Sequence, residues 1–194
     1  MNKIFLPIIS SLLFITACSN NKGKQPAPVD KNYEYLISME GIGPVKLEMS
    51  QEELEKLLNK KIPLTNPTDT VSGSWQDTAT VKYKDIDLKI HFQRNYVKGD
   101  SFYMYVIGVE TSSPLGKTSS GLSLGADRST IIDTYENNLI LIWPDYLQED
   151  TSSDKKRYLI DVRDEKQNSR EISFSVVNKK VVSIKAGIHF SDSE

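Results

Sequence analysis

The chain contains one cysteine, Cys18, among its 194 residues, so no disulfide can form within it. The residues after this cysteine must therefore fold around a core of apolar side chains. Residues 33–194 suffice for one sizeable core, since a chain of this length buries roughly 70% of its unfolded surface. The formal net charge is −2, and no block of five like charges occurs, which argues against a nucleic-acid-binding face.

Cys18 ends a segment with the features of a secretory signal. A positively charged start at Lys3 is followed by an apolar run over residues 4–15, interrupted only by one proline and two serines. The run is too short to span a bilayer, so it predicts a signal peptide over residues 1–17. An uncleaved membrane helix and an ordinary secretory signal without lipid are the two alternatives.

The four residues Ile15-Thr16-Ala17-Cys18 resemble the lipobox of bacterial lipoproteins. The resemblance implies that the Cys18 thiol receives a diacylglycerol group and that Cys18 becomes the first residue of the mature protein. Each buried acyl methylene contributes about 0.8 kcal/mol, so two or three chains of the palmitate type would form a permanent membrane anchor. The residue after the cysteine is Ser19 rather than Asp, which by family analogy favours the outer membrane if the cell has one.

Residues 18–32 form the predicted lipidated N-terminus and flexible tether. Their composition is rich in Lys, Asn, Gly and Pro and shows no apolar periodicity. As a random coil, such a segment spans on the order of 20 Å. We therefore expect a folded body that is held close to the membrane.

Two short helices are predicted in the body, each opened by a residue that can cap it. Ser50 begins a capping box with Glu53, and Asp127 takes the corresponding position in the second half. Apolar residues then follow at helical spacing, at positions 54, 57 and 58 in the first half and 131, 132 and 135 in the second. Pro63 and Pro67 prevent the first helix from continuing.

Period-two alternation after each helix predicts antiparallel strands. The predicted strands cover residues 79–83, 86–92, 103–109, 158–162, 172–176 and 182–188. Residues 83–86 and 177–181 are the predicted hairpin turns, although neither contains the favoured Asn-Gly pair. The sequence therefore predicts an α+β fold of two tandem repeats, residues 33–112 and 113–194, each a short capped helix packed on a small antiparallel sheet.

This layout resembles the tandem fold of the β-lactamase inhibitor protein and of small envelope lipoproteins built from the same helix-on-sheet unit. The resemblance covers most of residues 40–190. It depends on the order of elements and on the openings at residues 45–50 and 122–127, where the second opening has Gly125 and the first has Glu48. It implies a protein-binding or assembly role and assigns no site residue.

The histidines and carboxylates do not form a recognisable catalytic or metal-binding set. His91 and His189 lack a neighbouring cysteine or a spaced carboxylate cluster, so solvated strand positions are the simpler interpretation. Asp85 and Asp87 can share one strand face, and residues 161–164 contain a second carboxylate pair. No Gly-x-Ser-x-Gly or phosphate-loop motif is present. We therefore expect no catalytic residue, no cofactor and no metal.

Apolar side chains in the predicted strand around residues 102–107 lie on both faces, with Met104 and Val106 on one and Tyr103 and Tyr105 on the other. One of these faces is either exposed to a partner or packed against the other half of the molecule. The sequence thus predicts a membrane-anchored envelope lipoprotein that binds a protein partner without catalysis. A wall- or glycan-acting hydrolase and a carrier of a small apolar ligand remain alternatives.

Overall fold

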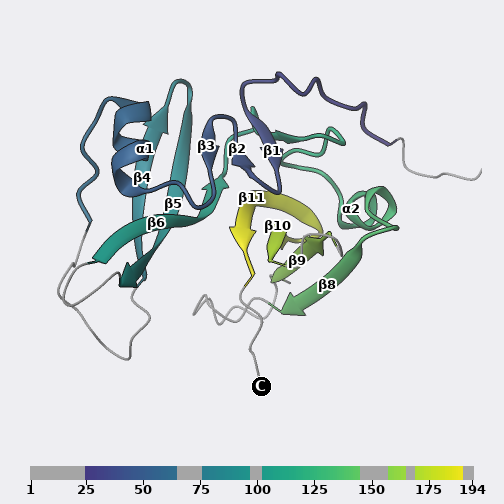
Figure 1. Ribbon diagram of the computed structural model, residues 1–194. Helices are drawn as coiled ribbons and strands as arrows, with labels where there is room; N and C mark the ends of the chain where they lie inside the picture. The colour runs from purple at the N-terminus through teal and green to yellow at the C-terminus, as the bar shows by residue number, and fades with distance from the viewer. Residues whose placement is uncertain (1–24, 65–75, 97–101, 145–156, 165–168, 190–194) are drawn as a thin grey trace, which may run out of the picture.

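The computed structural model describes residues 25–64, 76–96, 102–144, 157–164 and 169–189 (Figure 1). Within them, one antiparallel sheet of seven strands dominates the molecule, and a second sheet of four very short strands lies across it. The signal peptide, the lipobox with Cys18, and Trp75 lie outside the described residues.

The large sheet contains strands from both halves of the chain. In spatial order they are β4 (Gln76–Tyr83), β5 (Ile86–Tyr96), β6 (Phe102–Thr111), β11 (Lys180–Ile188), β10 (Arg170–Val177), β9 (Arg157–Arg163) and β8 (Leu139–Pro144). The small sheet has the order β3 (Val45–Lys46), β2 (Gly41–Ile42), β1 (Leu36–Ser38) and β7 (Lys117–Thr118). The helices are α1 (Gln51–Leu58) and α2 (Arg128–Thr134).

The predicted α+β fold of two helix-on-sheet repeats is wrong. The described residues form a mostly β structure with only two short helices, and the two halves do not build separate sheets. The reason is the antiparallel pairing of β6 with β11, which places Val109 opposite Ala186 and joins the strands of both halves edge to edge. Backbone groups that two separate sheets would leave unpaired are thereby hydrogen-bonded.

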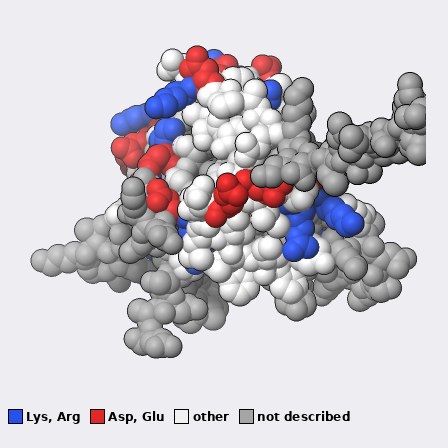
Figure 2. Space-filling model, turned by 90° about the vertical axis from the view of Figure 1, so that its right-hand side faces the viewer, with Lys and Arg blue, Asp and Glu red and all other residues white. Residues whose placement is uncertain are grey.

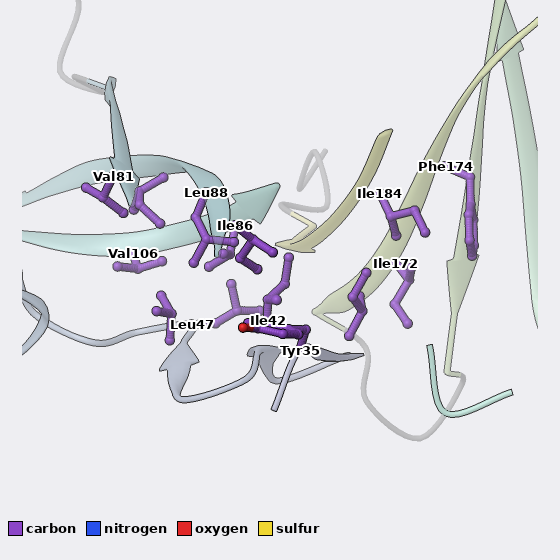
Figure 3. Close-up of a cluster of buried hydrophobic side chains, with 14 of the residues drawn as sticks. Tyr35, Ile42, Leu47, Val81, Ile86, Leu88, Val106, Ile172, Phe174 and Ile184 are labelled. Carbon is purple, nitrogen blue, oxygen red and sulfur yellow. The ribbon is translucent and has the colours of Figure 1, made fainter. Parts of the chain in front are cut away.

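One face of the large sheet forms the core. A single row of paired apolar residues crosses all seven strands: Ala79, Ile90, Val109, Ala186, Ile172, Val162 and Ile140. The small sheet covers this face with fully buried Ile37 and Ile42. Figure 3 shows Ile42 and Tyr35 between side chains of the first half, such as Leu88, and Ile172 of the second half. The two halves therefore share one core.

The strand and turn predictions from alternation are confirmed. All six predicted strands lie within observed ones. The β10–β11 hairpin turns through Asn178 and Lys179, both with positive φ (50° and 69°), as a two-residue turn of the primed type requires. The β4–β5 hairpin turns through Lys84, whose φ is 49°.

The two helix caps differ. At α1, the Ser50 hydroxyl accepts a hydrogen bond from the Glu53 N–H, and the Glu53 carboxylate accepts one from the Ser50 N–H at 2.7 Å, so the predicted capping box is confirmed. At α2, Asp127 occupies the N-cap position but its side chain does not cap. It instead pairs with Lys180 at 3.0 Å on the exposed surface.

Replacing each cap residue by alanine therefore has unequal effects. Ser50→Ala is expected to lower the free energy of unfolding by about 1 kcal/mol, because the Glu53 N–H in the first turn loses the hydroxyl that accepts its hydrogen bond. Asp127→Ala is expected to lower it by less than about 0.5 kcal/mol, since only an exposed ion pair is lost. Urea unfolding at neutral pH measures both values. Equal losses would contradict the structural difference between the caps.

Candidate functional site

Strand β8 is the most unusual surface element of the described chain. It lies at one end of the large sheet, next to α2, and pairs only with β9 among the described strands (Figure 1). Its six residues, LILIWP, include no charged side chain. Leu139, Ile142 and Trp143 are exposed at 44%, 38% and 49%. An edge strand with apolar side chains on both faces and unpaired backbone groups is a template for another strand.

The opposite end of the sheet lacks these features. Strand β4 alternates buried residues with exposed Thr78, Thr80 and Lys82. Polar and charged side chains on an edge strand hinder the addition of a further strand. The two ends of one sheet therefore differ in chemistry, and only β8 is suited to pairing with another chain.

Trp143 is held in place by a hydrogen bond. Its indole Nε1–H donates to the Asp161 carboxylate at 2.9 Å, and Asp161 is itself buried. The bond satisfies both polar groups and fixes the ring along the non-core face of the sheet. A large aromatic ring that is positioned but half exposed is typical of protein interfaces.

The pairing of β6 decides between the two alternatives for the apolar faces of residues 102–107, exposure to a partner or packing against the other half of the molecule. A β-bulge between the pairs His91–Gly108 and Phe92–Val106 shifts the alternation of β6 at Ile107. Met104 and Val106 consequently lie in the core, and Tyr103 is the exposed residue of the group at 45%. The face that carries Met104 and Val106 is therefore packed against the rest of the molecule and is not exposed to a partner.

His91 lies on the polar face of the sheet, as alternation predicts, but it is half buried rather than solvated. Its Nε2 is 3.4 Å from the Glu110 carboxylate. This hydrogen bond is the main cause that lowers the pKa of Glu110 from 4.5 to about 2, and hydrogen bonding by Ser183 and the nearby Lys89 add to it. The Glu110 carboxylate therefore lies between the Ser183 hydroxyl and the His91 imidazole. A nucleophilic dyad would instead need the serine next to the histidine.

His189 belongs to a second group on the same face. The Arg163 guanidinium donates to Glu171 at 3.0 Å and to the His189 Nδ1 at 2.9 Å. Glu171 is buried, and its charge is balanced by Arg163. Both predicted histidines thus have protein partners that account for their positions, and the two groups do not meet.

The other candidate carboxylates are also dispersed. Asp85 accepts a hydrogen bond from the Tyr35 hydroxyl, and Asp161 is bonded to Trp143. The hollow of about 440 Å³ beside α1 contains Glu52 and Glu55, but Glu55 accepts bonds from the Ile62 N–H and from Lys61, which lower its pKa and keep it ionised. Among the described residues, no three His, Cys, Asp or Glu side chains are grouped as metal ligands, and neither helix is long and apolar enough to cross a membrane.

Glu110 provides a test of the polar face through the pH dependence of stability. Because its pKa is lowered on folding, its stabilising contribution is complete above about pH 4.5 and is lost as the pH falls towards 2. We expect wild-type protein to lose about 2–3 kcal/mol more unfolding free energy over this range than Glu110→Gln. Urea unfolding at several pH values measures this. Glu136→Gln, which removes an exposed carboxylate, is the control, and parallel pH curves for wild type and Glu110→Gln would contradict the expectation.

Comparison with known proteins adds no residue role to these observations. No family model matches the chain, and no curated protein or solved structure matches it. The contacts and exposure of the described residues are therefore the basis for functional proposals.

Proposed function

We propose that the protein is a lipid-anchored envelope protein that binds a partner protein at the β8 edge and catalyses no reaction. The observation that carries this proposal is the exposed, uncharged edge strand with Leu139, Ile142 and Trp143 at its surface. The hollow beside α1 is lined by charged side chains and one asparagine, and none of its lining residues is apolar, which supports binding at the apolar edge rather than in this hollow.

The partner segment that fits this edge is an extended peptide with apolar residues at alternate positions. Added next to β8, it would pair its backbone with the outer N–H and C=O groups, which no other described strand pairs, and continue the sheet. Its side chains would contact Leu139 and Trp143 on one face and Ile142 on the other, because successive side chains point to opposite faces. Backbone pairing would supply affinity, and the alternate side chains would supply specificity.

A second copy of the chain is the less suitable occupant. The edge is only six residues long, and strand pairing of that length alone buries well under the roughly 1,200 Å² typical of stable specific interfaces. A peptide that folds onto the edge from a larger partner can add contacts elsewhere. The membrane anchor would keep the edge concentrated near partners on the same membrane.

Lipid attachment at Cys18 is tested by metabolic labelling with an alkyne-bearing palmitate analogue. We expect the wild type to be labelled and to sediment with membranes, and Cys18→Ala to be unlabelled, because the thiol is the atom that forms the thioether. Equal labelling of both proteins, or none of the wild type, would end the lipoprotein proposal.

Strand addition is tested with ten-residue peptides selected from a random library for binding to the purified protein. Ile142→Lys is expected to weaken a selected peptide at least about tenfold, because a charge is placed at the pairing edge. Val182→Lys, at a similarly exposed apolar residue away from β8, is the control and should bind normally.

Methylation of alternate backbone nitrogens of the same peptide separates strand pairing from side-chain binding. One of the two methylation patterns should abolish binding, since it removes the N–H groups directed at β8. Peptides that tolerate both patterns, or that are indifferent to Ile142→Lys, would refute the β8 proposal. A dimer broken by Ile142→Lys would identify a second copy as the occupant instead.

A further inference from the structure

Part of the predicted tether does not extend away from the body but lies on it. We call residues 25–32 the strap. The N–H of Val29 donates to the carbonyl oxygen of Ser119 at 3.0 Å, and Pro26 and Val29 are partly buried. The strap ends in a turn, where the Asp30 carbonyl accepts from the Tyr33 N–H at 3.0 Å.

The seat of the strap is shaped by Gly121. This residue has φ +81°, and a Cβ on it would lie 2.1 Å from the Ala27 carbonyl oxygen. Any residue with a Cβ at position 121 would therefore displace the strap from the 117–121 loop. The loop itself is well fixed, since the Gly121 N–H donates to Thr118 and the Leu122 N–H donates to the Thr118 hydroxyl.

The strap also reaches α2. A hollow of about 390 Å³ lies between Gln25, Pro26 and Pro28 of the strap, Ser119 and Ser120 of the loop, and Thr134 at the end of the helix. Pro26 and Pro28 favour an extended backbone and lack N–H groups that would need partners. The strap is thus suited to lie along the loop as a stiff segment.

The number of residues between Cys18 and the strap limits how far this side of the molecule can lie from the lipid-bearing residue. Gln25 follows Cys18 by seven residues, so the two Cα atoms are at most about 25 Å apart. If the strap were released, the first fixed residue would be Tyr33, fifteen residues after Cys18, and this limit would rise to about 50 Å. The bound strap therefore halves the largest possible distance between Cys18 and the first fixed residue of the body.

The charged side chains on this side of the molecule do not provide another way to orient it towards a membrane. Figure 2 shows the side that lies to the right in Figure 1, where the strap and α2 are found. Most of the visible described surface is uncharged, and its acidic and basic groups lie next to one another. A face of this kind has no strong electrostatic attraction to anionic lipid.

We infer that the strap holds the side of the molecule formed by the 117–121 loop and α2 against the bilayer. This inference depends on the proposed lipid anchor at Cys18 and adds to it the surface that faces the membrane. Because β8 begins next to α2, the binding edge starts close to the headgroups. A partner peptide would then come from a membrane-adjacent segment.

Gly121 and Gly125 provide a matched pair of variants. Their φ values are almost equal, +81° and +80°, so alanine strains the backbone similarly at both positions. A Cβ at Gly125 meets no atom within 4 Å, whereas one at Gly121 meets the strap. Only Gly121→Ala is expected to release the strap. Val29→Pro, which removes the N–H donor to Ser119 and leaves the body unchanged, is a second releasing variant in case Gly121→Ala does not fold.

Release of the strap is measured in the full mature chain by trypsin cleavage after Lys31. We expect cleavage roughly tenfold faster in Gly121→Ala and Val29→Pro than in wild type or Gly125→Ala, because a seated segment must open before a protease can bind it. Equal rates in all four proteins would overturn the strap. This measurement does not require lipid, so it holds or fails independently of the lipid anchor.

Orientation is measured with the lipidated chain in vesicles of phosphatidylethanolamine and phosphatidylglycerol that carry a headgroup quencher. A fluorescent amino acid replaces either exposed Glu136, after α2, or exposed Lys82, on the far strand β4. In wild type and Gly125→Ala, the label at 136 should be quenched about threefold more than the label at 82, whereas strap release should bring the ratio near one. Equal quenching in lipidated wild type would overturn the membrane-facing surface and leave the lipid anchor intact.

Discussion

The pairing of β6 with β11 is the interaction on which the rest of the molecule depends. It spans the register pairs from Gly108–Gly187 to Thr111–Ile184. The remaining part of the same β6 edge is closed by the segment before α1, where Val106 exchanges hydrogen bonds with Glu48 and Met49 at 2.7 and 2.9 Å. Neither half could otherwise satisfy this row of backbone groups. The small sheet and the ion pairs of Arg170 with Glu40 and Glu48 then pack the two halves together.

This junction also explains why the functional proposal concerns one end of the sheet. Joining the halves at β6 and β11 leaves β4 and β8 as the outer strands, and only β4 carries polar side chains along its exposed face. The apolar β8 is next to α2, on the side of the molecule where the strap begins. Sheet topology, edge chemistry and the position of the strap are therefore the three observations behind the proposed binding strand near the membrane.

Local features of the sequence predicted the elements well but not their assembly. Alternation and the Ser50 capping box identified strands and α1 because each depends on neighbouring residues. The β6–β11 pairing joins residues more than seventy positions apart, and no local pattern encodes it. The strands of the small sheet are two or three residues long, too short for periodicity to reveal them. The α+β repeat prediction failed because it assumed that each half closes on itself.

The proposed binding edge, strand β8, was only partly visible in the sequence. The run Leu139–Pro144 contains the large aromatic residue Trp143 but has no alternation, so periodicity does not distinguish it from a buried segment. A continuous apolar run that ends in proline was the available signal, since proline is confined to edges and ends of sheets. The contact of Gly121 with Ala27 had no such signal, because the two residues are far apart in the chain.

Native-state hydrogen exchange in increasing urea tests the shared sheet most directly. If β6 and β11 join the halves into one folding unit, the slowest amides of β5 and β10 will open with the same free energy and the same dependence on urea. Amides of β5 that open at clearly lower free energy and with a smaller urea dependence than those of β10 would show two independent units. That result would contradict the single sheet and the edge assignments that follow from it.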